Sequence, residues 1–286
     1  MTNKKFNIIG IGELLWDMLP DGKELGGAPA NFTYHTNLLG ADSIIISALG
    51  NDEQGKEILS LMKERNLNYS INIVEYSTGW VSVKLSNGTP NYVIHKNVAW
   101  DFIKLKKEVI SVLEKADAIC FGTLSQRSEE SFKTIHRAIN LVPKTALKVL
   151  DVNLRQSYYT KKIIEESLKC ANVLKLNDEE LVVLSNMFNL ANTQDEACKQ
   201  LLNQFNLKLL ALTKGSEGSI LFPQNEISRH SVPKVKVVDT IGAGDSFTAA
   251  MVIGMLNGKP LKKIHKEAAE YAAKVCMHKG GTPKLI

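Results

Sequence analysis

The sequence has little of what defines several large protein classes. Its four cysteines, Cys120, Cys170, Cys198 and Cys276, lie far apart and show no paired spacing. This excludes a disulfide-framed domain and a cysteine zinc site, and it predicts buried thiols in a reducing compartment. No apolar run approaches the roughly 20 residues of a membrane span, and the first residues show no signal-peptide pattern. We therefore expect a cytoplasmic protein that has no membrane partner.

An excess of charge of one sign is also missing. The 35 basic and 30 acidic residues leave a net charge of +5 that is spread along the chain. The densest basic run, residues 104–107, has the composition of a solvated helix start, so we expect no nucleic-acid partner. The length of 286 residues allows one large α/β domain or a main domain with a small attachment.

Two common phosphate-binding motifs are absent. Gly10-Ile11-Gly12 follows a short apolar stretch, but Leu15 stands where a dinucleotide-binding turn has its third glycine. The chain has no Gly-x-x-x-x-Gly-Lys-Ser/Thr string, which excludes a P-loop, and no protein-kinase motif set. Any phosphate must therefore be bound by other groups.

The sequence does contain short apolar segments that alternate with helical segments. The patterns predict strands at residues 6–11, 13–19, 43–48, 118–122, 148–151, 173–176 and 209–213, and helices at residues 29–39, 54–65, 128–141, 161–170, 178–184 and 193–205. Such alternation is typical of a parallel sheet with helices on both faces. Between residues 79 and 95 two alternating stretches flank Asn87-Gly88, a hairpin turn signal, which predicts an inserted antiparallel flap.

The most informative stretch is Val237–Phe247. Its β-branched start, ending on Asp239, predicts a strand, and Gly242-Ala243-Gly244 permits a tight turn with exposed backbone. The run from Ser246 to Leu256 then has helical spacing. A glycine turn that leads into a helix start is an anion site, because free N–H groups and the positive end of the helix dipole converge there. Asp245 in the first turn can either cap the helix or accept a proton from an attacking hydroxyl.

Two strings resemble one known family. Asp-Thr-x-Gly-Ala-Gly-Asp-x-Phe at residues 239–247 resembles the C-terminal signature of the ribokinase-like (PfkB-type) carbohydrate kinases. Gly-Gly-x-x-x-Asn at residues 26–31, followed by Leu-Gly-Ala and by residues 49–55, resembles the N-terminal half of the same family. The resemblance covers essentially the whole chain and implies an ATP-dependent sugar kinase. It also implies a ribokinase-like α/β fold over residues 1–286, with a central mostly parallel sheet flanked by helices and a small β-lid.

The lid is expected from about residues 13–20 and 77–98. Its aromatic residues Trp80 and Tyr92, together with Trp100, can form lid core or a surface on which a sugar stacks. Because a flat lid exposes strand edges, it can also pair with a second copy as a homodimer.

The resemblance implies roles for the C-terminal string. Asp245 would be the catalytic base, and the backbone N–H groups of Gly242, Ala243 and Gly244 would neutralise charge on the transferring phosphoryl group. A monovalent cation, K⁺, would be held by three further residues: Asp239, Ile241 and Gly280.

Sugar binding is expected from Asp17, Gly26, Gly27 and Asn31. A sugar presents hydroxyls at fixed angles, so a selective site needs short polar side chains and close backbone approach. Gly-Glu-x-Leu-x-Asp at residues 12–17 looks more like the fructokinase branch than the ribokinase branch, which favours fructose. Ribose, 2-keto-3-deoxygluconate and nucleosides stay open as substrates. The alternative for Asp17 is a solvated residue of a lid strand.

Nucleotide binding is expected at the ends of other strands. Asn177 and Glu180 resemble the family's Asn-x-x-Glu motif, which organises Mg²⁺ and phosphates, and they can equally begin a helix with acidic residues in its first turn. Thr213, Gly215 and Gly218 resemble the loop that borders ATP.

Two more residues complete the predicted site. Arg155, expected among the substrate-binding residues, lies in Asp-Val-Asn-Leu-Arg, where the family has Asp-Pro-Asn-x-Arg, and can clamp a phosphate or pair with a surface carboxylate. Val275 would wall the adenine. A different class of function, a sugar or nucleotide sensor that kept the fold and lost catalysis, would have no need of Asp245. The sequence therefore favours a kinase with ATP, Mg²⁺ and K⁺ as cofactors and a small sugar as partner.

Overall fold

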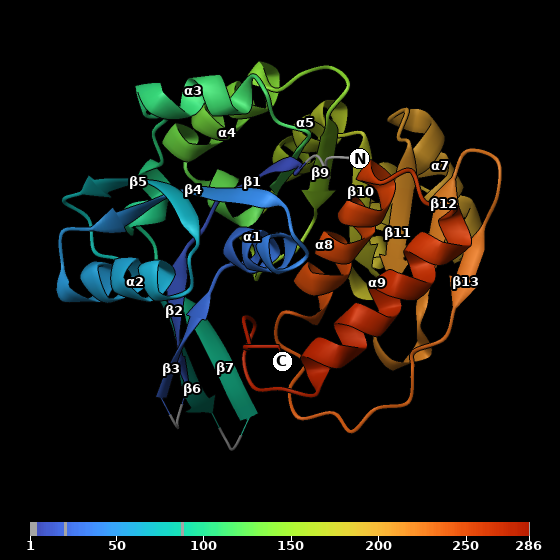
Figure 1. Ribbon diagram of the computed structural model, residues 1–286. Helices are drawn as coiled ribbons and strands as arrows, with labels where there is room; N and C mark the ends of the chain where they lie inside the picture. Colours follow the sequence, from blue (N-terminus) through green and yellow to red (C-terminus); the bar gives the residue numbers. More distant parts are fainter. Residues whose placement is uncertain (1–4, 20–21, 87–88, 286) are drawn as a thin grey trace.

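Two sheets organise the computed structural model, which describes residues 5–19, 22–86 and 89–285 (Figure 1). The larger sheet has the strand order β13-β12-β11-β10-β9-β8-β1-β4-β5. Its strands are β1 (Asn7–Ile11), β4 (Asp42–Gly50), β5 (Asn68–Val74), β8 (Ala118–Phe121), β9 (Leu147–Asp151), β10 (Val173–Asn177), β11 (Leu209–Thr213), β12 (Ser219–Pro223) and β13 (Ser228–His230). All pair in parallel except β12 and β13, which are antiparallel.

Helices cover both faces of this sheet. One face carries α1 (Ala28–Leu38), α8 (Ala243–Leu256) and α9 (Leu261–Cys276). The other carries α3 (Lys107–Leu113), α4 (Glu129–Leu141), α5 (Lys161–Cys170), α6 (Asp178–Phe188) and α7 (Gln194–Gln204). Three short 3₁₀ helices are η1 (Ala99–Phe102), η2 (Leu124–Arg127) and η3 (Gly215–Glu217). In the described part of the chain, no helix combines the length and apolar character needed to cross a bilayer.

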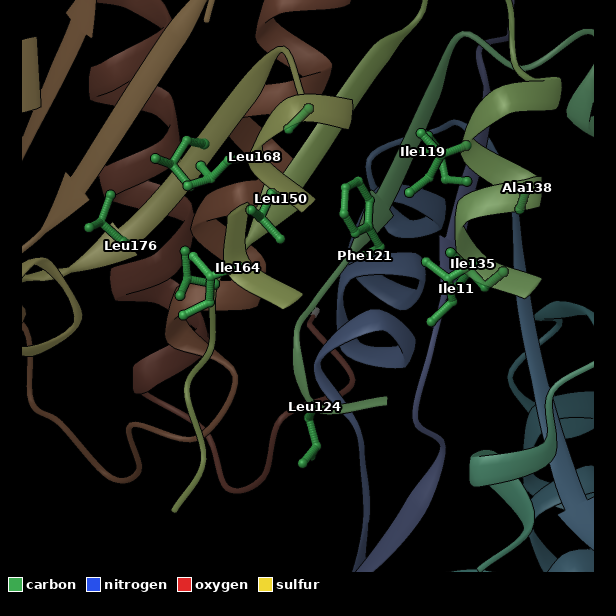
Figure 2. Packing of buried hydrophobic residues seen from close by; sticks show 14 of the residues in the cluster. Ile11, Ile119, Phe121, Leu124, Ile135, Ala138, Leu150, Ile164, Leu168 and Leu176 are labelled. Atoms are coloured by element: carbon green, nitrogen blue, oxygen red, sulfur yellow. The ribbon is translucent and has the colours of Figure 1, made fainter. Parts of the chain in front are cut away.

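Burial on both faces explains the apolar strands. All four residues of β8 are buried, and the side chains of Ile119 and Phe121 pack on the face covered by α4. Figure 2 shows these two side chains with Ile135 and Ala138 of that helix. A parallel strand covered on both sides has no polar face, so its sequence is a continuous apolar run. The predicted α/β architecture is confirmed.

The smaller sheet lies beside the carboxyl ends of the strands (Figure 1). Its order is β3-β2-β6-β7, formed by β2 (Leu15–Leu19), β3 (Gly22–Gly26), β6 (Gly79–Ser86) and β7 (Thr89–Ile94). The helix α2 (Glu53–Glu64) shares a core cluster with β2 and β3. Trp80 of β6 stacks on His95, which directly follows β7, and Trp100 in η1 is 1% exposed and therefore a core residue. The predicted turn Asn87-Gly88 and the side chain of Tyr92 lie outside the described residues.

The predicted strand ending on Asp239 is wrong. Residues 231–241 form no strand, and Val237 and Val238 are 57% and 60% exposed. The backbone N–H groups of Val238 and Asp239 donate to the carbonyl of Cys276 at the end of α9, at 2.8 and 3.2 Å. β-branched residues favour strands because they pack on neighbouring strands, and here the end of a helix takes the place of a strand partner.

Candidate active site

The turn before α8 has the geometry of an anion site. Gly242 begins the helix with a left-handed φ of 76°, and a Cβ atom there would lie 2.6 Å from the Cα of Gly281, so both conformation and packing require glycine. The N–H of Ala243 donates to the carbonyl of Thr240 at 3.2 Å. The next N–H groups, from Gly244 onward, belong to the first turn, where a helix offers donors without intrahelical acceptors.

Asp245 lies in this first turn and faces another element. Its Oδ2 accepts a hydrogen bond from Asn31 Nδ2 of α1 at 2.8 Å, and α8 has no side-chain cap. Asp245 therefore does not cap α8 through a side-chain hydrogen bond, and its role as catalytic base stays a prediction. Burial raises the pKa of Asp245 to about 6; the Asp151 carboxylate also raises it, and the Lys175 ammonium and the Asn31 hydrogen bond lower it. The carboxylate is therefore ionised at neutral pH and close enough to its pKa to accept a proton.

Asn31 joins the two halves of the predicted site. Its side chain is 4% exposed, and its Oδ1 has no hydrogen-bond partner among the described residues. A Cβ atom on Gly281 would lie 2.7 Å from Asn31 Nδ2, so the C-terminal segment covers this side chain. A buried acceptor without a partner costs free energy unless a water or ligand donates to it.

Asp17 comes from β2 and lies against the turn that leads into α1. A Cβ atom on Gly26 would clash with the Asp17 carboxylate, and one on Gly27, at a φ of 109°, would clash with the Glu13 carbonyl. Glycine is therefore needed at both positions because the turn packs closely on β2 and its preceding loop. The sequence had suggested another reason for these glycines, namely open access to a sugar ring. Burial raises the pKa of Asp17 to about 6, the Arg155 charge lowers it, and the Glu24 charge raises it.

Arg155 follows β9 and is exposed. Its positive charge lowers the pKa values of Glu13, Asp17 and Asp245, so its guanidinium lies near all three carboxyl groups. Arg155 thus faces the site. The structure brings together Asp17, Asn31, Arg155 and Asp245, which lie far apart in the sequence.

The three residues predicted to hold a monovalent cation are also adjacent. Asp239 Oδ1 accepts from the N–H of Ile241 at 3.0 Å, and its Oδ2 accepts from the N–H of Gly280 at 2.9 Å. The carboxylate thereby ties the loop before Gly242 to the C-terminal segment.

The C-terminal segment is anchored on α1. Tyr34 Oη donates to the carbonyl of Pro283 at 2.7 Å, and His35 Nε2 lies 2.9 Å from the carbonyl of Gly281. Burial lowers the pKa of His35 to about 4, so the ring is neutral at neutral pH. Figure 1 places this end of the chain between the small sheet and the last turn of α9.

Asn177 and Glu180 form a capping box at the start of α6. Each side chain accepts from the other's backbone N–H at 2.8 Å, and the second Glu180 oxygen accepts from the N–H of Leu154 at 2.9 Å. Glu180 is 5% exposed. These contacts support the helix-start interpretation, and a role toward Mg²⁺ or phosphate stays a prediction.

The other predicted nucleotide residues lie at β11 and α9. Thr213 ends β11, and its Oγ1 lies 3.4 Å from the carbonyl of Leu176. Gly215 begins η3 and Gly218 follows it, with φ of 52° and 105°, and a Cβ atom on Gly218 would clash with the carbonyl of His230. Val275 is fully buried in α9. Their contact with a nucleotide stays a prediction.

Comparison with known proteins identifies the family. The model of the pfkB family carbohydrate kinases matches residues 21–285. This chain belongs to that family. An uncharacterized sugar kinase from Pyrococcus horikoshii is 30% identical, with a TM-score of 0.83 over 96% of this chain and 93% of that one. Its complex with ATP gives a TM-score of 0.81 at 28% identity over 96% and 94%.

Two curated relatives carry more specific names. Fructokinase-2 from Zea mays is 26% identical, covering 97% of this kinase and 90% of its own length. An ATP-dependent 6-phosphofructokinase from Thermoanaerobacterium thermosaccharolyticum is 26% identical over 91% and 85%. The predicted family and the ribokinase-like fold are confirmed, and this carbohydrate kinase has relatives with different named substrates.

Two buried charged groups of this kinase near the predicted site were not singled out from the sequence. Glu13, directly after Gly12, is 1% exposed, and burial raises the pKa of its carboxyl group. Lys175 is 7% exposed within β10 and forms an ion pair with Asp151 at 2.9 Å. A lysine inside a buried apolar strand was a signal available in the sequence, because lysine is almost never fully buried unless paired.

Proposed function

We propose that this sugar kinase transfers the γ-phosphoryl group of ATP to the primary hydroxyl of fructose. The observation that carries the proposal is Asp245 at the start of α8, hydrogen-bonded across the site to Asn31. Asp245 accepts the hydroxyl proton while the hydroxyl oxygen bonds to the γ-phosphorus and the bond from phosphorus to the bridging β-oxygen breaks. ADP leaves with that oxygen, and the N–H groups at the start of α8 stabilise the negative charge.

A neutral sugar fits the acceptor side better than a sugar phosphate. Glu13, Asp17 and Glu24 place three carboxyl groups there, and Arg155 is the cation whose charge acts on two of them. Carboxylates and the free Asn31 oxygen accept hydrogen bonds from hydroxyl groups, whereas a second phosphate would be repelled. Short acceptors at fixed positions suit a hexose such as fructose, and the named fructokinase among the relatives supports this choice.

ATP as the donor is supported by the ATP complex of the Pyrococcus horikoshii relative and by the glycines of the η3 loop. Mg²⁺ would be held mainly by the nucleotide phosphates and water, because the Glu180 oxygens already accept two backbone N–H groups. Asp239 accepts from the backbone N–H groups of Ile241 and Gly280, and the carbonyl groups of these two residues, together with the remaining lone pairs of the carboxylate, would supply oxygen ligands that suit K⁺. The bound ion would fix the loop that precedes Gly242. ATP use and free thiols also suit the cytoplasm.

The test is a turnover screen of the purified protein. ADP formation would be measured with ATP, Mg²⁺ and fructose, ribose, 2-keto-3-deoxygluconate, a nucleoside or fructose 6-phosphate as acceptor. We expect fructose to give the highest kcat/KM. A higher value for another acceptor would overturn the substrate and leave the kinase. Sugar binding by calorimetry without ADP formation from any acceptor would instead establish the sensor alternative.

A further inference from the structure

We propose that Lys175, paired with Asp151, is a positioning residue for phosphoryl transfer that places a fixed positive charge beneath the anion-binding turn at Gly244. The proposal rests on the proposed kinase function. It adds to the site a charged group that comes from the middle of the sheet rather than from a loop.

The ion pair is built into the sheet and tied to α8. Lys175 Nζ on β10 donates to Asp151 Oδ1 at the end of β9 at 2.9 Å, and the two side chains are 9% and 6% exposed. The other Asp151 oxygen, Oδ2, accepts from Thr248 Oγ1 at 3.1 Å. Thr248 Oγ1 also lies 2.9 Å from the carbonyl of Gly244. The pair is thus connected to the first turn of α8 through one threonine.

The ammonium group lies directly against the turn. A Cβ atom on Gly244 would be 2.9 Å from Lys175 Nζ, so glycine at this position lets the charge approach the backbone. A positive charge there adds to the helix dipole and to the N–H donors that face a transferring phosphoryl group. Because the pair is buried, water screens this charge less than it would screen a surface lysine.

Fold stability alone is a weak reason for such a pair. A buried ion pair can often be replaced by apolar residues with no loss of stability, because removing two charges from water is costly. The kinase offers a matched comparison in Arg127 and Asp101, whose side chains are 7% and 6% exposed and form an ion pair at 2.9 Å. That pair joins η1 to η2, and among the described residues none of the hydrogen bonds between the two side chains involves α8.

The two charges act on Asp245 in opposite directions. Asp151 raises the pKa of Asp245 and Lys175 lowers it. Arg155 and the hydrogen bond from Asn31 also lower it, and burial is the largest cause of its rise. The Cys120 thiol of β8 also faces this group of charges. Removing Lys175 should therefore make Asp245 harder to ionise, and removing Asp151 should make it easier.

The experiment compares pH–rate profiles of Lys175→Met and Asp151→Asn with the wild type and with Asp101→Asn as control. We expect Lys175→Met to lower kcat roughly 10²-fold, the typical loss for one oxyanion donor, with little change in KM for the sugar. The acid limb of its profile should move to higher pH. The acid limb of Asp151→Asn should move to lower pH, and that of Asp101→Asn should stay at the wild-type position even if its melting temperature falls.

Coincident acid limbs in the wild type and the folded Asp151 and Lys175 variants would overturn the proposal, as would shifts in the same direction. If Lys175→Met does not fold, the proposal is tested by Asp151→Asn alone. A shift of its acid limb to lower pH would support the proposal, and no shift or a shift to higher pH would overturn it. A ¹³C NMR titration of the Asp245 carboxyl group in the same proteins gives a readout independent of turnover. If the wild type has no kinase activity but the two substitutions move the NMR-derived pKa of Asp245 in opposite directions, the proposed function is refuted. The arrangement of charges around Asp245 would still be supported.

Discussion

At the start of α8 a carboxyl group is held where burial makes its ionisation unfavourable. The pKa of Asp245 is about 6 in the folded protein, above its ordinary value of 3.8. When the folded pKa of an acid is raised, the unfolded state releases its proton more readily, so stability falls as pH rises through this interval. The fold therefore carries a local destabilisation at neutral pH in the residue proposed to act as base, a common trade between stability and activity.

Asp245→Asn separates these two properties. The substitution keeps an acceptor for Asn31 and removes the base, so we expect kcat to fall roughly 10²–10⁴-fold with sugar affinity largely kept. The melting temperature should rise at neutral pH and approach that of the wild type as the pH falls well below 3.8, where the carboxyl group is protonated in both states. Turnover and thermal unfolding across pH measure both effects. Near-normal turnover would support a capping role instead.

Asp17→Ala tests the sugar side. Loss of a buried hydrogen bond to a hydroxyl costs about 1–3 kcal/mol, so KM for the sugar should rise roughly 5- to 150-fold while KM for ATP stays nearly unchanged. Because the pKa of Asp17 is also about 6, the KM of the wild-type enzyme for the sugar should rise below that pH. Asp42→Ala, at the exposed start of β4, is the control. Unchanged constants in the Asp17 variant would place the sugar elsewhere.

At the scale of elements, prediction succeeded where burial produces a simple pattern. The parallel strands β1, β8, β9, β10 and β11 are short apolar runs, and their predicted bounds agree with the structure to within about one residue. The prediction omitted β3, β5, β12, β13 and α9. β3, for example, reads Gly-Lys-Glu-Leu-Gly and is a strand only because it pairs with β2. Its cause is tertiary pairing, which no local pattern records.

The loop between β13 and α8 carries the cation prediction. Asp239 ties this loop to Gly280, so an ion bound beside the carboxylate would hold the turn at Gly242 in place. We expect the rate to increase when K⁺ replaces tetramethylammonium at constant ionic strength, and Asp239→Ala to lose that increase. Initial rates in matched buffers measure it. Equal wild-type rates in both buffers would rule out the activation.

At the scale of the whole molecule, the sequence predicted which residues belong to the candidate site better than it predicted how they contact one another. The strings around Asn31 and Asp245 marked both residues, but nothing local indicated that they bond to each other across 214 positions. Lys175 and Asp151 likewise meet only because β9 and β10 are neighbours in the sheet. Such pairings follow from topology, which the sequence expresses only through the complete fold.

The small sheet also bears on assembly. Its outer strands β3 and β7 have unpaired edges within the described residues, and such edges can pair with another chain. We expect a homodimer formed through this lid, with a mass twice the 31.6 kDa of the chain. Light scattering over a range of concentrations measures it. A monomeric mass at every concentration would contradict the dimer and leave the proposal of a single domain over residues 1–286 unaffected.

The anchoring of the C-terminal segment on α1 has a consequence for biosynthesis. Tyr34 and Pro283 are 249 positions apart, and the contact between them closes the segment over Asn31. The ribosome makes the residues proposed to bind the sugar first and those proposed to bind the phosphoryl group last, and folding proceeds in the same direction. A nascent chain therefore holds an incomplete site until residues 280–283 have emerged. The proposed phosphoryl transfer therefore depends on contacts that form only after residues 280–283 have been made.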